Sequence, residues 1–502
     1  MVAGANSCHG LFYRLFINAS LIGDKKIIFG FIFHIDMKFK RIILYTLFIL
    51  LVALAGFLWR IAPEANGYTA KYLCSLTYTS GLDPEQGMEL YVKPTHALFS
   101  MVVPEIIRDK KEVTARFLGF LRPRTAVWRE GCGCTLLVNK TAEELHSAHD
   151  VPHALKASID NMNALWPDGT IVSRDSIREA INWSAIDSIL DEAMQETTDD
   201  PAKRSNTLAL VVAWKGRIIG ERYAEGVDKN TSLLGWSAAK SVTGSLTGVM
   251  VKKHGMDITV PIGLPQWAGD WRKGITINHL LRMESGLDFA EDYAPLADAT
   301  KMLYESADMG AFAAAHPPTT RPGERWAYSS GTTNLLADIL YERIGGTPAA
   351  IHYLAYEEFF NKLGITTAVF EHDESDAFVG SSYLYMSARD WLRVCKLYMD
   401  NGLWNGEQIL PPGWVKYALT PAPQSTNACY GAQIWLNAAN DPADRKLPGL
   451  PPDTYMFRGF QGQWVVGIPS MDLMLVRLGV THDDEAWSPE EVMLRLRSAL
   501  GM

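Results

Sequence analysis

The amino-acid sequence predicts an α+β fold, in which an antiparallel sheet is flanked by terminal helices and carries an inserted α-rich lobe. Two observations support this prediction. Strand patterns lie near both ends of the span 207–479, and helical patterns stand before and after them. Between the strands, 256–450 is rich in helical patterns and in Pro/Gly loops. Such a pattern is typical of a single sheet whose first and last strands pair with each other, while the residues between them form a separate lobe.

Composition limits the classes of function. The chain has 502 residues, of which 48% are hydrophobic, enough for one large domain and a smaller part. The formal net charge is −9, and no long basic block follows residue 60. A surface that binds nucleic acid is therefore not expected.

The first element in the chain is an apolar helix over 42–59, which carries no charged residue and is long enough to cross a bilayer. Lys38, Lys40 and Arg41 precede it, and short segments rich in Lys and Arg remain on the cytoplasmic side. We therefore expect a cytoplasmic tail over 1–41, a membrane anchor over 42–59, and the rest of the chain outside the cytoplasm, on the periplasmic side of the inner membrane.

Two features of this end of the chain leave alternatives open. The small residues of ALAG, 53–56, would suit cleavage of a signal peptide, in which case the mature protein lacks the helix. Met37 begins the basic stretch MKFKR, which is typical of the start of an export signal. Residues 1–36 are therefore expected to come from an over-extended start.

Residues 60–175 mix short apolar runs with Pro and Gly, and they predict a membrane-proximal segment that packs on the main domain. Outside the cytoplasm disulfides are permitted, and Cys74 is expected to pair with Cys132 or with Cys134. Cys395 lies in an apolar helical pattern, which is typical of a buried free thiol.

Regular patterns predict the main domain over 176–502. An amphipathic helix is expected over 176–197, where apolar residues recur at every third or fourth position. A β-hairpin follows over 207–226, with its turn at Lys215 and Gly216.

The remaining elements close the domain. A second helix is expected to begin near Ser237 and to end at Gly255. Two strands are expected over 463–479, around a turn at 469–472. The last helix opens with the capping-box pattern of 488–491.

The second helix carries a pair of residues with catalytic potential, Ser237 and Lys240. Residues three apart on a helix share a face, so the lysine amine can reach the serine hydroxyl. A serine hydroxyl needs a nearby base to act as a nucleophile, and a lysine can serve when burial lowers its pKa. The ordinary alternative is an N-cap serine followed by a solvated lysine.

Two later stretches supply possible companions for this pair. In RPGERWAYSSGTTNLLADIL, 321–340, Tyr328 and Ser330 precede a helical pattern, and a tyrosine beside such a pair can carry a proton to a leaving group. In FRGFQGQWVVGIP, 457–469, a turn containing glycine can present the backbone N–H of Phe460 to a substrate carbonyl.

These three motifs, in this order, resemble those of the penicillin-recognising serine hydrolases. That family comprises class C β-lactamases, D-alanyl-D-alanine carboxypeptidases, related esterases and the 6-aminohexanoate-dimer hydrolases, which the chain resembles most. The resemblance covers roughly residues 175–502 and includes ITINHLLRMESGLDF at 275–289 and YGAQIWLN at 430–437. It implies a β-lactamase-like fold and hydrolysis of small amide or ester substrates through an acyl-enzyme, without a metal or cofactor.

The resemblance also implies roles for individual residues. Ser237 would be the nucleophile, Lys240 its activating group, and Tyr328 the acid/base. The backbone N–H groups of Ser237 and Phe460 would form the oxyanion hole. The residues expected to bind substrate are Ser330, Arg458 and Gly459.

Two departures from the β-lactamase pattern change the expected substrate. Ser330 stands where β-lactamases carry asparagine, and Phe457, Arg458 and Gly459 stand where they carry Lys-Thr-Gly. Dedicated β-lactam hydrolysis is therefore not expected, and D-amino peptidase or β-lactamase activity stays an alternative to the cleavage of small amides or esters. Arg458 could meet a substrate carboxylate, or point to solvent. Substrate choice is expected to depend on loops at 286–326 and 370–385.

The sequence also offers three other interpretations. GWSAA, 235–239, is a degenerate nucleophile elbow of an α/β-hydrolase, but the polar EGVDKNTS precedes it where a buried strand should stand. A catalytically idle, membrane-tethered binding protein would use the same fold, since fold does not fix function. Finally, His146, His149 and His153 have the spacing of zinc ligands on a helix, although Pro152 would interrupt that helix. A polar surface loop is the favoured interpretation of these histidines.

Overall fold

The computed structural model describes residues 37–147, 163–177 and 181–502, and it divides the chain into two compact units, Met1–Arg60 and Ile61–Met502. Helix α3, Met37–Tyr78, begins in the first unit and ends in the second. Its side chains up to residue 60 are almost all exposed, and its most apolar window has a mean hydropathy of 2.6. By length and composition this helix could cross a membrane.

From Ile61 onward the same helix is buried in the second unit. Two of its polar residues there have partners in other segments: Lys71 Nζ donates to Glu371, and Asn66 Nδ2 donates to the carbonyl of Leu121 at 2.9 Å. A buried charge is tolerated when it is paired in this way. Lys71 and Glu371 therefore connect the helix to a distant part of the chain.

A four-stranded antiparallel meander follows α3, in the order β1-β2-β3-β4. The strands are β1 Val102–Ile107, β2 Glu112–Phe117, β3 Leu121–Arg129 and β4 Gly133–Leu136. A disulfide joins Cys74 on α3 to Cys134 on β4, which decides between the two pairings left open by the sequence. Cys132 and Cys395 are buried free thiols.

The main sheet has six antiparallel strands in the order β12-β13-β14-β15-β5-β6. The strands are β5 Thr207–Trp214, β6 Arg217–Tyr223, β12 Trp435–Leu436, β13 Tyr455–Gly459, β14 Gln463–Ile468 and β15 Leu473–Gly479. Strand β5 pairs with β15, so the first and last long strands of the domain are neighbours inside the sheet. The predicted hairpin and the predicted strands over 463–479 are present.

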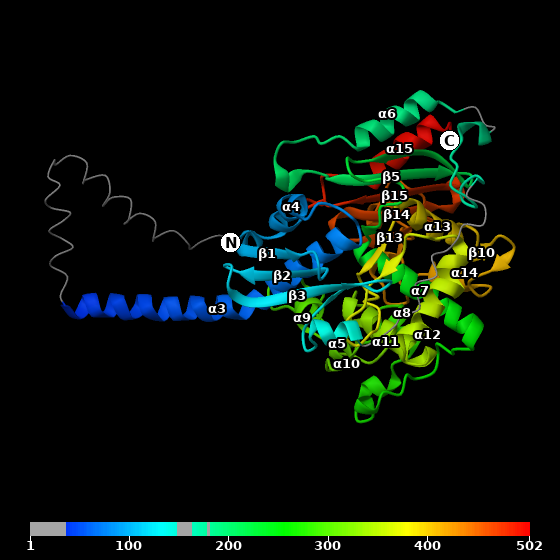
Figure 1. The fold of residues 1–502 in the computed structure, drawn as a ribbon. Helices are drawn as coiled ribbons and strands as arrows, with labels where there is room; N and C mark the ends of the chain where they lie inside the picture. Colours follow the sequence, from blue (N-terminus) through cyan, green and yellow to red (C-terminus); the bar gives the residue numbers. More distant parts are fainter. Residues whose placement is uncertain (1–36, 148–162, 178–180) are drawn as a thin grey trace, which may run out of the picture. The chain divides into compact units, whose positions relative to one another are not determined.

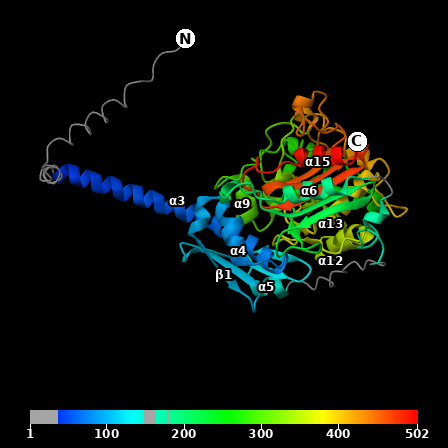
Figure 2. The same ribbon diagram turned by 90° about the horizontal axis from the view of Figure 1, so that it is seen from above.

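Helices cover both faces of this sheet. Helices α6, Trp183–Ala193, and α15, Pro489–Ala499, lie side by side on one face (Figures 1 and 2), where they share an apolar core with the strands. Helix α13, Ala388–Met399, packs against β5, β14 and β15. The α+β class, with an antiparallel sheet flanked by terminal helices, is thus confirmed.

The inserted lobe lies in the chain between β6 and β12 and is mostly helical, as predicted. Its helices are α7 Ala239–His254, α8 Ile277–Leu281, α9 Asp298–Glu305, α10 Met309–Ala314, α11 Ser330–Ile344, α12 Pro348–His352, α13 and α14 Trp414–Ala418. Its short strands are β7 Leu233–Leu234, β8 Val369–Phe370, β9 Leu384–Met386, β10 Leu403–Trp404 and β11 Glu407–Gln408.

Two local expectations need correction. The helix expected over 176–197 begins at Trp183, because the side chain of Asn182 caps it by accepting from the N–H of Ala185, at 3.1 Å. At the start of α15, Ser488 is the N-cap residue but its side chain makes no capping hydrogen bond. The capping box expected at 488–491 is therefore not formed, although the helix begins where predicted.

Candidate active site

Ser237 lies in a single 3₁₀ turn, Trp236–Ala238, immediately before α7. Trp236 has a φ of 46°, in the left-handed region that non-glycine residues rarely adopt, and its indole N–H donates to Gln461 Oε1 at 3.1 Å. Strand β13 passes close by, since a Cβ added to Gly459 would lie 2.1 Å from the carbonyl oxygen of Gly235. The backbone around Ser237 is therefore held by contacts from the end of the chain.

Lys240 is buried beside Ser237. Its Nζ lies 3.0 Å from Ser237 Oγ, 2.9 Å from Ser330 Oγ and 3.0 Å from the carbonyl oxygen of Ser381. The residue is only 1% exposed, and burial lowers its pKa to about 8, although the negative charge of Glu291 acts in the opposite direction. An amine with this pKa is partly neutral near pH 7 and can accept a proton.

Tyr328 stands just before α11, whose N-cap is Ser329. Its ring lies 4.9 Å from Lys240 Nζ, measured to the ring centroid, and packs against Trp435 at 5.0 Å between centroids. Burial raises the pKa of Tyr328, whereas a hydrogen bond with Ser237 and the charge of Arg458 lower it. The structure thus brings Ser237, Lys240 and Tyr328 together.

Glu291 lies close to these three residues. The sequence analysis did not identify its carboxylate as part of the site. Ser330 donates to it through both its hydroxyl and its backbone N–H, each at 2.6 Å, and Tyr293 donates its hydroxyl at 2.7 Å. Ser330 is fully buried and is not among the described residues that line a cavity at Ser237. It was expected to bind substrate, but its hydroxyl instead lies between Lys240 and Glu291.

Two cavities meet at Ser237. The smaller, of about 190 Å³, has mainly apolar walls that include Ile61, Ala65, Tyr68, Leu98 and Phe99. Ser237, Tyr293 and Phe460 line both cavities. We call the smaller one the apolar cavity.

The larger cavity, of about 570 Å³, contains charged side chains, and we call it the polar cavity. Tyr328, Arg458 and Gly459 line it, together with Lys446 and Asp484. The guanidinium carbon of Arg458 lies 4.3 Å from the ring centroid of Trp464, so this side chain lies over an aromatic ring at the cavity. The positive charge of Arg458 lowers the pKa of Lys446, which indicates that the two cations are close.

The loops that form the cavities differ in part from those expected. Residues of 286–326 line both cavities, as expected. No described residue of 370–385 lines either one, because this loop is buried: Glu371 accepts hydrogen bonds from Lys71 and Ser75. Instead, the wall of the apolar cavity is completed by α3 and by residues 95–99.

The structure describes only one of the three histidines that have the spacing of zinc ligands. His146 lies in the short helix α5, Ala142–Ser147. His149 and His153 lie outside the residues that the structure describes. His146 is therefore helical and not in the expected loop, whereas for the other two histidines the interpretation as a polar surface loop stays a prediction.

Comparisons with known proteins agree with this architecture. A curated 6-aminohexanoate-dimer hydrolase of Paenarthrobacter ureafaciens is 23% identical over 368 residues, which cover 63% of this chain and 91% of that protein. The crystal structure of a provisionally named β-lactamase from Bacteroides dorei aligns with a TM-score of 0.50 and 18% identity, covering 64% of this chain and 100% of that one. The second likeness shows the fold alone.

A sequence model of a whole family gives the firmest assignment. The model described as Beta-lactamase matches residues 186–485, more than half of the chain. The matched region begins in α6 and extends beyond β15, so it includes the six-stranded sheet, the helical lobe and the residues around Ser237. The chain belongs to the β-lactamase family.

Proposed function

We propose that the protein is a serine hydrolase that cleaves small amide or ester substrates through an acyl-enzyme on Ser237. The observation that carries this proposal is the contact of 3.0 Å between Ser237 Oγ and the buried amine of Lys240, whose pKa is lowered to about 8. A solvated lysine after an N-cap serine would show neither burial nor a lowered pKa.

The mechanism assigns a step to each group. Neutral Lys240 takes the proton from Ser237 as Oγ attacks the substrate carbonyl, and the backbone N–H groups of Ser237 and Phe460 stabilise the oxyanion. Tyr328 protonates the leaving group and afterwards helps a water molecule to attack the acyl-enzyme. Ser330 and Glu291 act through Lys240 by holding it in place, which is a positioning role.

The two cavities suggest which part of the substrate goes where. Tyr328 lines only the polar cavity, so a leaving group that it protonates would occupy that side. The acyl group would then lie in the apolar cavity, against Tyr68 and Leu98. Arg458 and Lys446, two neighbouring cations, would bind a carboxylate on the leaving group.

Similarity to a 6-aminohexanoate-dimer hydrolase supports amide bonds as one substrate class. Dedicated hydrolysis of β-lactams is not proposed, because Phe457, Arg458 and Gly459 replace the Lys-Thr-Gly pattern. No metal or cofactor takes part in the proposed reaction.

We also propose that α3 anchors the protein in a membrane, with residues 61–502 on the periplasmic side. The basic residues Lys38, Lys40 and Arg41 before the apolar stretch support this orientation. The disulfide between Cys74 and Cys134 supports it as well, because such bonds persist in oxidising compartments.

The test is the intact mass of the full chain in detergent after exposure to a fluorophosphonate probe. We expect one adduct on the wild type, none on Ser237→Ala and almost none on Lys240→Ala. Circular dichroism of each variant checks that it is folded. Folded wild type without an adduct would contradict the proposal and favour a catalytically idle binding protein. An equal adduct on Ser237→Ala would mean that another serine reacts.

A further inference from the structure

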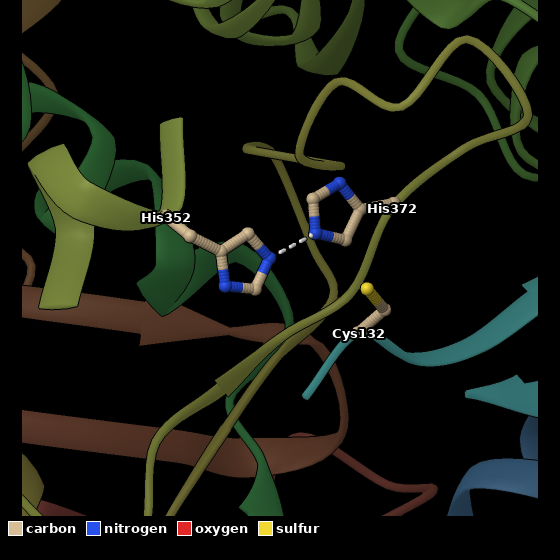
Figure 3. Close-up of side chains that lie close together, drawn as sticks. All are labelled: Cys132, His352 and His372. Atoms are coloured by element: carbon tan, nitrogen blue, oxygen red, sulfur yellow. Dashed lines mark hydrogen bonds between the residues drawn. The ribbon is translucent and has the colours of Figure 1, made fainter. Parts of the chain in front are cut away.

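Three buried side chains with metal-binding atoms converge at a point that the proposed reaction does not use. They are Cys132, in the turn between β3 and β4, His352, at the end of α12, and His372, just after β8 (Figure 3). One ligand atom from each lies within 4.8 Å of the others. None of the three lines either cavity at Ser237.

The hydrogen bonds at His372 define which ring nitrogen is available. Its Nδ1 lies 2.7 Å from the carbonyl oxygen of Asp376, and a carbonyl can only accept, so Nδ1 carries the proton. The lone pair of Nε2 therefore points at His352, whose own Nε2 lies 2.8 Å away. Histidines that bind metals commonly donate their other ring N–H to a backbone carbonyl, which fixes the orientation of the ring.

We propose that Cys132, His352 and His372 bind a thiophilic d¹⁰ metal ion, Zn²⁺ or Cu⁺. Two imidazole nitrogens and a thiolate are the donors that these ions prefer among protein side chains. Figure 3 shows the thiol beside the contact between the two rings, so that the three ligand atoms form a triangle.

Binding requires two adjustments. His352 donates its Nε2 proton to His372 Nε2 in the present hydrogen bond, so this proton must move to Nδ1 of His352, which has no hydrogen-bond partner among the described residues, and the two rings must then separate slightly. Two nitrogens bound at about 2.05 Å to one tetrahedral ion lie roughly 3.3 Å apart. The Nε2 atoms of His352 and His372 are at 2.8 Å, so binding would separate them by about half an ångström. A three-ligand site leaves a fourth position, which Zn²⁺ would fill with water or another donor and which Cu⁺ does not need.

Such an ion would join two parts of the chain. Cys132 belongs to the four-stranded meander, whereas His352 and His372 belong to the region that the β-lactamase family model matches. The disulfide at Cys134 and the ion pair between Arg129 and Asp376, at 3.5 Å, connect the same neighbourhood. The metal would therefore stabilise the attachment of the meander to the catalytic domain.

The experiment measures the metal content of the full chain, purified in detergent from cells grown with added zinc in one arm and added copper in the other. Desalted protein is analysed by plasma mass spectrometry. We expect about one ion per chain in one arm, and roughly tenfold less in Cys132→Ser. The matched control is Cys395→Ser, which removes a buried free thiol elsewhere in the fold and should keep the metal.

A second variant and a cobalt spectrum provide independent tests of the same site. If Cys132→Ser fails to fold by circular dichroism, His352→Phe serves as the second variant, with the same expected loss. Wild type grown with Co²⁺ should show thiolate-to-cobalt absorption in the near ultraviolet. Wild type without stoichiometric metal in either arm would overturn the proposal and leave a hydrogen bond between the two histidines. Equal metal in wild type and folded Cys132→Ser would overturn it as well.

Discussion

The two cavities at Ser237 differ in both lining and origin. The polar cavity is built mainly by the region that matches the β-lactamase family, including Tyr328 and Arg458. The apolar cavity takes much of its wall from residues that precede that region, Ile61 to Phe99. The proposed catalytic groups thus belong to the region that the family model matches, whereas the cavity proposed for the acyl group depends on the segment that precedes it.

The largest expected effect comes from Tyr328→Phe, a change in the polar cavity. Loss of the phenolic proton should slow turnover of amides by ~10²-fold or more, because amide leaving groups need protonation. Aryl esters, whose leaving groups need no proton, should be less affected during acylation. Steady-state and burst kinetics on a matched amide and aryl ester measure the difference. Normal amide turnover would remove Tyr328 from the mechanism.

Filling the apolar cavity tests its assignment to the acyl group. Leu98→Trp should lower kcat/KM for long-chain acyl esters by roughly 10-fold while short-chain esters keep their rates, since the larger side chain fills only the deep part of the cavity. The matched control is Met101→Trp. Met101 is exposed, lies with Leu98 in the 3₁₀ helix Ala97–Met101 and lines neither cavity. A loss that is equal for all chain lengths would contradict the assignment.

A charge change in the polar cavity tests whether this cavity binds the leaving group. Arg458→Gln should raise KM by about 3- to 10-fold for substrates with a carboxylate on the leaving group, because one of two neighbouring cations is lost. Substrates without that carboxylate should keep their KM. Arg497→Gln, at an exposed position in α15, is the control. An unchanged KM for the carboxylate substrate in Arg458→Gln, or the same change for both substrates, would place the carboxylate elsewhere.

The smallest expected effect is a shift in pH dependence. Only neutral Lys240 can accept the proton of Ser237, so kcat/KM should rise with pH and level off above the lysine pKa of about 8. The charge of Glu291 raises that pKa, so Glu291→Gln should move the rise to lower pH. A pH–rate profile of both proteins measures this. An unchanged profile would show that Lys240 is not the group that titrates.

Sequence reasoning was most successful where the signal is local. Ser237 and Lys240 are three residues apart, and helix geometry alone predicts that their side chains meet. The strands of 463–479 follow from alternation around a turn. Similar local patterns placed the hairpin of 207–226.

Features that depend on long-range contacts were missed. Glu291 is one acidic residue among several in a loop, and only the fold brings it to Ser330, 39 residues away. The meander β1–β4 has no clear repeat in the sequence, and Cys132 lies far along the chain from His352 and His372. Spacing rules for metal ligands detect neighbours along the chain, so they find no signal for such a cluster.

Helix α3 has a consequence for any shortened form of the protein. Its residues 61, 64, 65 and 68 line the apolar cavity, only a few positions after the exposed apolar stretch. A polypeptide that started at Ile61 would begin with a helix end whose first N–H groups lack partners, and helix ends fray. If α3 anchors the protein as proposed, cleavage close to this point would loosen one wall of the cavity while leaving Ser237 and Lys240 in place, so the released form would differ in selectivity and keep the proposed catalytic pair.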